Sequence, residues 1–388
     1  MILIKKSRKG STMPRIKNSI SVAAISISML CTLFASNLTA DTLSEKIEKR
    51  GTINAFNAWQ TQKGMSGYGL YWNGDDNPNN GTSSQRKKTI VLTTPTWNYY
   101  YPLGGYNYPG IEPFLTDRNW NHDAEYGKTV ALDISNPAFV PYFINLVDMR
   151  KGASDGVMLD WWHNHHSSGL SEGEVQKSRL NLVKAMREHF GPNFVILGNV
   201  SWRKDTVTAR YLSGVFLELY KEPYQSSSNR LYTRAELKEM QGLLDFYQEK
   251  LGYPKIIALE GWRKTDSLTD TDRNSSENRR IAKIMTAMSA VIPDNGYILY
   301  GDNNPDTPIG DHNHLLYDFY KFNIGKPIKD AVKITSNARY REFENGVIAY
   351  NLGSQQVKIS SGGFEIEVEG ESAAFCKYSK TAPECVYE

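Results

Sequence analysis

The chain has 388 residues, 45 Lys and Arg against 42 Asp and Glu, and 12% aromatic residues. Six of the basic residues and none of the acidic ones lie within residues 1–40, which leaves 39 basic against 42 acidic side chains in the remainder, a formal charge of −3. The composition therefore gives no sign of the basic surface that binds nucleic acid.

The start of the chain predicts a secretory signal peptide over residues 1–40. Its charged residues precede an apolar, small-residue run at 20–35, and Ala40 provides a small residue for cleavage, with Met1 and Met13 as alternative start sites. A membrane anchor and a lipoprotein are the alternatives. Ser and Thr residues make the run weakly apolar for a permanent span, and Cys31 follows Leu30, not a small residue. We expect a periplasmic or secreted protein with no stable membrane span.

Short apolar runs then alternate with stretches of helical periodicity. Strands are predicted at 67–72, 89–94, 129–134, 156–161, 194–200, 214–219, 255–260 and 296–300, and helices at 138–150, 171–190, 204–212, 233–251, 278–291 and 312–322. This alternation predicts an α/β fold with a parallel sheet. We expect a (β/α)8 TIM barrel over residues 41–325 with an irregular first quarter, because 73–88 and 97–127 show no convincing helix. A doubly wound open sheet is the alternative.

The pattern changes after residue 325. Short strands at 340–343, 346–351, 356–360 and 364–368 with intervening turns predict a small all-β domain over residues 326–388. Cys376 and Cys385 lie nine residues apart in a chain expected to be exported, which favours a disulfide over two free thiols.

Three predicted strands end in a carboxylate, where a barrel carries its site: Asp160, Glu218 and Glu260. Glycoside hydrolysis needs two carboxyl groups flanking the scissile bond. The sequence does not fix which two of the three act. We expect Asp160 to act as nucleophile or base, Glu218 as general acid, and Glu260 as a third carboxylate that binds the sugar or sets a pKa. The structural alternative is an ion pair with a loop arginine such as Arg203 or Arg263. The sequence does not say whether the anomeric configuration is retained or inverted.

Aromatic rings near these carboxylates indicate a sugar ligand, because flat rings bury the apolar faces of pyranosides. Trp161, Trp162, Trp202, Trp262 and Tyr220 follow predicted strands, and a cluster of aromatic residues lies at 97–101. Polar residues complete the expected substrate-binding set: Asp133, His163, Asn199 and Asp302.

Histidines at 163, 165, 166, 312 and 314 raise the alternative of a metal site beside Asp302, Asp306 and Asp311. Their spacing matches no specific metal motif, and the sequence has no phosphate loop, GxGxxG or GxSxG motif, so we expect no cofactor.

The segments at 132–137 (LDISNP) and 155–161 (DGVMLDW) resemble the bacterial hypothetical glycosyl hydrolase family 15. They are more distantly similar to endo-α-1,4-polygalactosaminidases, which share a DG-hydrophobic-LD strand, and the run REFENGV at 341–347 also resembles the first group. The resemblance implies a catalytic Asp160 on strand four and an acid on a later strand, at Glu218. Together these features predict an exported glycoside hydrolase acting on a polysaccharide. The alternatives are a non-catalytic glycan-binding barrel and a metal-dependent polysaccharide deacetylase.

Overall fold

The computed structural model of the protein describes residues 42–59, 66–72, 83–101, 108–119, 129–220, 231–264, 274–303 and 316–387. These residues belong to one compact unit, Asp41–Glu388. Within them, no helix combines the length and the apolar character needed to cross a membrane.

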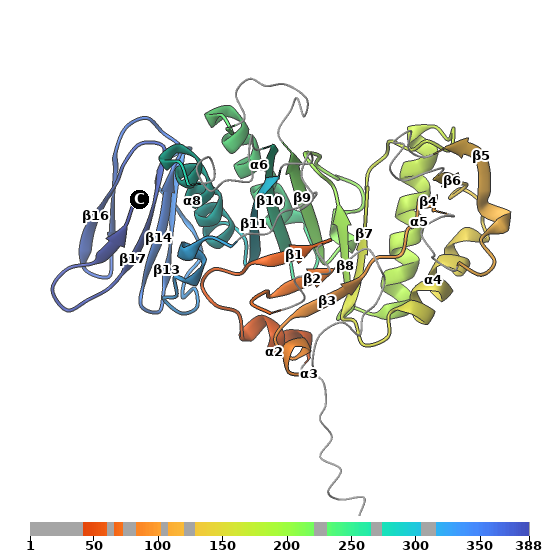
Figure 1. Cartoon of the computed structure of the whole chain (residues 1–388), viewed down its shortest axis with the longest axis horizontal. Helices are drawn as coiled ribbons and strands as arrows, with labels where there is room; N and C mark the ends of the chain where they lie inside the picture. The colour runs from red at the N-terminus through yellow and green to blue at the C-terminus, as the bar shows by residue number, and fades with distance from the viewer. Residues whose placement is uncertain are drawn as a thin grey trace, which may run out of the picture. The chain divides into compact units, whose positions relative to one another are not determined.

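Eight parallel strands form the central sheet, in the order β1-β2-β3-β7-β8-β9-β10-β11 (Figure 1). They are β1 (Phe56–Ala58), β2 (Leu70–Trp72), β3 (Ile90–Thr93), β7 (Gly156–Leu159), β8 (Val195–Asn199), β9 (Gly214–Tyr220), β10 (Ile256–Lys264) and β11 (Asn295–Asn303). The Ile298 N–H donates to the Asn54 carbonyl at 2.9 Å, and a parallel bridge between Ala55 and Ile298 joins the first strand to the last. The sheet closes into a barrel, which confirms the predicted (β/α)8 class.

The long helices among the described residues lie where the periodicity predicts them: α4 (Phe139–Arg150), α5 (Glu172–Phe190), α6 (Arg234–Lys250) and α8 (Ser276–Val291). The short helices α2 (Leu43–Glu48) and α3 (Ser83–Arg86) were not predicted. Ser171 and Glu174 form a complete capping box at the start of α5. Between β2 and β3, the described residues hold only the four-residue α3, which agrees with the irregular first quarter.

Side chains alternate between the barrel interior and the helix layer. The interior cluster consists of every second strand residue, among them Phe56, Leu70, Trp72, Leu92, Met158, Leu197, Phe216, Ala258 and Leu299. Their neighbours along the strands pack outward with the helices. Since successive side chains of a strand point to opposite faces, the residue two positions after an interior residue also faces inward.

A buried ion pair fixes the start of β7, the strand that leads to Asp160. Lys46 of α2 contacts both carboxylate oxygens of Asp155, at 2.8 and 2.6 Å, and the Val91 N–H donates to Asp155 at 2.8 Å. Burial raises the pKa of the Asp155 carboxyl, while the Lys46 charge opposes this rise. Next to it, a Cβ on Gly156 would lie 2.1 Å from the Val195 carbonyl oxygen, so only glycine fits between β7 and β8.

Two errors in the predicted strands cancel in the count of eight. The run at 129–134 is not a barrel strand: it forms β6 (Val130–Leu132), the middle strand of an antiparallel sheet with β4 (Tyr99–Tyr100) and β5 (Leu115–Asn119). The true first strand is β1, which was not among the predicted strands. The run at 67–72 is therefore strand two, and Asp160 still follows strand four.

Two helix predictions were also wrong in their extent. Residues 204–212 contain only the 3-10 turn η4 (Ala209–Tyr211), because the Asp205 carboxylate accepts the N–H groups of Val207 and Thr208 and holds a turn. In the run at 312–322, the described part contains the 3-10 turn η5 (Asp318–Lys321), and residues 312–315 lie outside the described residues.

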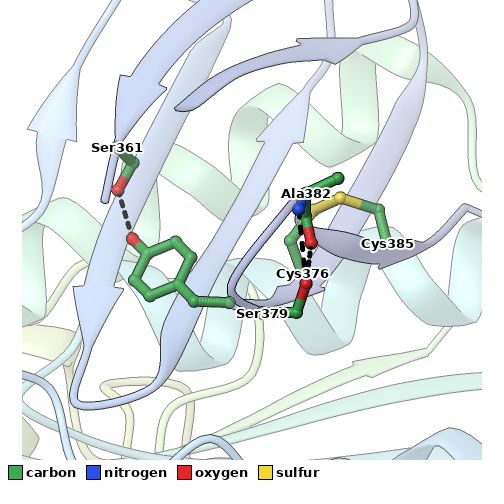
Figure 2. The surroundings of a disulfide bond; sticks show 6 residues. Ser361, Cys376, Ser379, Ala382 and Cys385 are labelled. Carbon is green, nitrogen blue, oxygen red and sulfur yellow. Dashed lines mark hydrogen bonds between the residues drawn. A yellow bond between two sulfur atoms is a disulfide. The ribbon is translucent and has the colours of Figure 1, made fainter. Parts of the chain in front are cut away.

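The C-terminal strands form the predicted small β domain. A five-stranded sheet contains β12 (Val332–Lys333), β13 (Ala338–Phe343), β14 (Gly346–Asn351), β17 (Ser372–Lys377) and β18 (Glu384–Val386), and β15 (Val357–Ser361) pairs with β16 (Phe364–Val368). Helix α8 contacts both β11 of the barrel and β14 and β17 of this domain (Figure 1). Cys376 and Cys385 are cross-strand partners joined by the predicted disulfide, beside a turn in which the Ala382 N–H donates to Ser379 Oγ at 3.3 Å (Figure 2).

Candidate active site

Polar side chains replace the apolar interior at the carboxyl ends of four neighbouring strands. Met158, Leu197, Phe216 and Ala258 belong to the interior cluster. Two positions further along their strands stand Asp160, Asn199, Glu218 and Glu260. By the alternation of strand side chains these four face the barrel axis, above an apolar floor. The fold thus brings the three predicted carboxylates to one end of the barrel.

Asn199 joins two of the carboxylates directly. Its Nδ2 donates to Asp160 Oδ1 at 2.8 Å and to Glu218 Oε2 at 2.7 Å. The two oxygens that share this nitrogen are therefore at most about 5.5 Å apart, while retaining glycosidases hold their two carboxyl groups about 5–5.5 Å apart. Inverting enzymes need about 6.5–9.5 Å to admit a water molecule.

Glu260 lies beside this pair on the next strand. Its Cα is the register partner of Glu218 across β9 and β10. Its side chain is 0% exposed, whereas that of Glu218 is partly exposed. Glu260 is therefore enclosed by protein, whereas Glu218 remains partly open to solvent.

The backbone at Asp160 is fixed by two tryptophans. The Trp97 indole N–H donates to the Asp160 carbonyl at 2.6 Å, and the Trp162 N–H donates to the Asn199 carbonyl at 2.6 Å. Between them, Trp161 has a left-handed φ of 52°, which is costly for a bulky residue and persists only when its surroundings hold it. The chain thus turns sharply after β7 and keeps Asp160 at the barrel mouth.

The adjacent residues Trp161 and Trp162 have different positions. Trp161 is 44% exposed, consistent with the predicted sugar contact. Trp162 is fully buried: its ring lies 4.7 Å from that of Trp97, its indole N–H donates to Thr208 Oγ1 at 2.9 Å, and the Arg179 guanidinium lies over it at 4.7 Å. Trp162 was predicted to bind substrate. The structure contradicts this prediction, because the fully buried ring has no exposed surface for a ligand.

His163 is also enclosed. It is 5% exposed, and its ring lies 5.6 Å from that of Trp161. Burial, with the nearby charges of Arg203, Arg179 and His165, lowers the pKa of His163 to about 3. The imidazole is therefore neutral across the ordinary pH range and packs edge-on near the exposed Trp161.

Trp202 and Tyr220 lie together at the ends of β8 and β9. The Trp202 indole N–H donates to the Tyr220 carbonyl at 3.1 Å, and both side chains are partly buried. Trp262 is the register partner of Tyr220, and Asp302 is that of Arg263, but the side chains of Trp262 and Asp302 lie outside the described residues.

Asp133 is not at a barrel strand end. It follows β6 in the antiparallel sheet, and its Oδ1 accepts from the Ser135 N–H at 3.0 Å and the Ser135 hydroxyl at 2.6 Å. The run at 129–134 was predicted to be a barrel strand, which placed Asp133 at the barrel mouth. That placement is wrong, because this run forms β6 of the antiparallel sheet. Its local hydrogen bonds are those of a turn that leads into α4.

Trp59 is an aromatic residue at the mouth that the sequence analysis missed. It follows β1, has a left-handed φ of 65°, and its ring meets that of Trp72 edge-on at 6.4 Å, on top of the interior cluster. The signal that would have found it is the short run at 55–59 (AFNAW), which ends in an aromatic residue as the other strand ends do.

Among the described residues, no three His, Cys, Asp or Glu side chains gather as a metal site would require. His312, His314, Asp306 and Asp311, which the metal alternative also uses, lie outside those residues.

Comparison with known proteins gives a family match. The family model described as "Hypothetical glycosyl hydrolase family 15" matches residues 97–347. A comparison with curated proteins finds no match.

Solved structures with a similar chain path include the glycoside hydrolase domain of PelA from Pseudomonas aeruginosa. Its sequence identity is 11% and its TM-score is 0.44, and the match covers 69% of this chain and 100% of that chain. Aspergillus fumigatus Ega3 in complex with galactosamine has 12% identity, coverages of 66% and 93%, and a TM-score of 0.43. The maltogenic α-amylase AmyB from Thermotoga neapolitana has 13% identity, coverages of 79% and 77%, and a TM-score of 0.42.

Proposed function

The chain belongs to hypothetical glycosyl hydrolase family 15 and is a glycosidase, and we propose that it cleaves a polysaccharide by a two-carboxylate mechanism that retains the anomeric configuration. The observation that carries the proposal is the single Asn199 nitrogen that hydrogen-bonds both Asp160 and Glu218. The limit that it sets on the distance between the two bonded oxygens supports direct attack by one carboxylate over attack by an intervening water.

In this mechanism, an oxygen of the ionised Asp160 bonds to the anomeric carbon as the glycosidic C–O bond breaks. Glu218 gives its proton to the leaving oxygen. In the second step, a water oxygen attacks the anomeric carbon, its proton passes to Glu218, and the bond to Asp160 breaks.

The roles follow from the neighbours of each group. A carboxyl group beside a second acidic side chain holds its proton more readily than an isolated one, and the register places Glu218 next to Glu260. Asp160 hydrogen-bonds Asn199 on the adjacent β8 and lies three strands from Glu260 in the sheet order. Glu218 is therefore assigned as the acid, Asp160 as the nucleophile, and Glu260 as the supporting carboxylate.

The exposed Trp161 with Trp202, Tyr220 and Trp59 would bind the sugar rings around this pair. The formal charge of −3 outside residues 1–40 suits a neutral or cationic glycan.

A single assay tests the activity and its stereochemistry. The chain from residue 41 is incubated with a panel of bacterial exopolysaccharides, and released reducing ends are measured. The first-formed anomer is then identified by proton NMR before mutarotation. We expect the product to have the configuration of the cleaved linkage. The opposite anomer would contradict the carboxylate separation, and binding without reducing-end release would favour the non-catalytic alternative.

We also propose that the protein is exported, with residues 1–40 removed before the barrel (41–325) and β domain (326–388) function. The basic, then apolar, then small-residue order of the leader supports this, as does the Cys376–Cys385 disulfide, which an oxidising compartment favours. Mass spectrometry of the protein from the periplasm or medium of a bacterial host should give an N-terminus at Asp41, and Ala40→Lys should block this cleavage. A chain that keeps residues 1–40 in the membrane fraction would contradict the proposal.

A further inference from the structure

We infer that Asn199, predicted as a substrate-binding residue, is instead a positioning residue that fixes the distance and ionisation of the Asp160–Glu218 pair. This inference rests on the proposed function for its catalytic consequence. It is carried by the geometry of one buried amide, whose nitrogen and oxygen both have protein partners.

The amide of Asn199 has a fixed orientation. Its Oδ1 accepts the Ser201 N–H at 3.1 Å, and Ser201 has a left-handed φ of 48° that turns this N–H back toward β8. A flipped amide would set its oxygen against two carboxylate oxygens and its NH2 against an N–H group. The orientation is therefore determined by the hydrogen-bond network, with one N–H for each carboxylate.

The backbone that carries the amide is equally constrained. A Cβ on Gly198 would lie 2.8 Å from Cδ1 of Trp162, so the indole lies directly against β8. Trp162 also donates its N–H to the Asn199 carbonyl at 2.6 Å. The buried Trp162 thus acts through β8 to hold Asn199, which gives this tryptophan a supporting role in place of a sugar contact.

Asn199 itself is 2% exposed, and both polar atoms of its side chain have protein partners. It has little surface to offer a glycan. Its two donors instead favour the ionised form of each carboxyl group, because hydrogen bonds to a charged form favour that form; at Glu218 they oppose the proton retention that the neighbouring Glu260 causes. Losing the donors should make both groups harder to ionise and allow them to separate.

The test is the pH dependence of Asn199→Ala and Asn199→Ser beside the wild type. We expect Asn199→Ala to lower kcat by about 10–100-fold, the usual effect of losing a group that orients a reacting residue, with a smaller change in KM. Both limbs of the kcat/KM profile should move to higher pH, since they report the acid and base of the free enzyme. Asn199→Ser keeps one hydrogen-bond donor, so its kcat and the positions of its two limbs should lie between those of the wild type and those of Asn199→Ala.

Asn351→Ala is the matched control. Asn351 is 1% exposed in β14, and its Nδ2 donates to the carbonyls of Gln355, Val368 and Glu369, away from the barrel mouth. This variant should lose stability but keep kcat and both limbs in place. An Asn199→Ala enzyme with unchanged limbs, or with its loss confined to KM, would overturn the inference.

A second readout separates this inference from the proposed function. Carboxyl carbons of Asp160 and Glu218 are titrated by 13C NMR, with Asp160→Asn and Glu218→Gln used for assignment. Upward shifts of both apparent pKa values in Asn199→Ala or Asn199→Ser support the positioning role even if no tested glycan is cleaved. Unchanged titrations in both folded variants refute it even if the wild type is an active glycosidase.

Discussion

Asp160→Asn is expected to lower kcat on the cleaved glycan by about 10⁴-fold or more, the scale seen when a nucleophile is removed from a concerted site. An amide of the same shape cannot form the covalent bond to the anomeric carbon. The fold should be kept, because the new side-chain oxygen can still accept from Asn199 Nδ2 and the Trp97 indole bonds only the backbone of residue 160. The measurement is reducing-end release, with glycan affinity determined by calorimetry.

Asp148→Asn provides the control for this variant. Asp148 is partly exposed on α4, where it pairs at 2.6 Å each with Lys151, just after α4, and with His189, in the last turn of α5. Its loss should leave kcat and glycan affinity unchanged. If Asp160→Asn retained wild-type turnover with intact folding, the assignment of the nucleophile would be wrong; if it also failed to bind glycan, its main role would be in binding.

Glu218→Gln is expected to show a loss that depends on the leaving group. For a natural glycan, whose leaving oxygen needs a proton, kcat should fall by about 10²–10⁴-fold, the usual contribution of general acid catalysis. For an aryl glycoside with an acidic phenol, bond cleavage should be nearly unaffected, and hydrolysis of the intermediate should become rate-limiting. Stopped-flow measurement of phenol release should then show a burst, and azide should restore turnover by replacing the activated water.

Glu260→Gln is the informative comparison, because Glu260 is the register neighbour of Glu218 and is fully buried. We expect it to reduce activity on natural and aryl substrates alike, without azide rescue, since it supports the pair and does not transfer the proton. Leaving-group dependence and azide rescue in Glu260→Gln instead of Glu218→Gln would exchange the two assignments.

Local pattern predicted most of the fold. The long helices α5 and α6 follow from periodicity and capping, and strands β7 to β11 from continuous apolar runs. The N-terminal part was harder, because a three-residue strand such as β1 carries little periodicity and is defined by its pairing with β2 and Ile298. The run at 129–134 has a strand pattern but pairs with β4 and β5 outside the barrel, and no local signal specifies a strand's partner.

The candidate site divides in the same way. The sequence pattern of a carboxylate directly after an apolar strand identified Asp160, Glu218 and Glu260. Parallel strands of a barrel end at the same mouth, and strand alternation turns such residues toward the barrel axis. The sequence could not distinguish Trp161 from Trp162, which are neighbours in the chain but are 44% and 0% exposed. That difference depends on a left-handed turn at Trp161 and on the distant Trp97, Arg179 and Thr208 that enclose Trp162.

The sequence by itself determined the class of barrel, the disulfide partners and the residues that bring carboxyl groups to one end of the sheet, since these depend on periodicity and on spacing along the chain. Only the tertiary structure decided that Asn199 lies between Asp160 and Glu218 and hydrogen-bonds both carboxylates. The physical reason is that a distance between side chains on three different strands depends on sheet register and barrel closure, which arise from contacts between residues far apart in the chain.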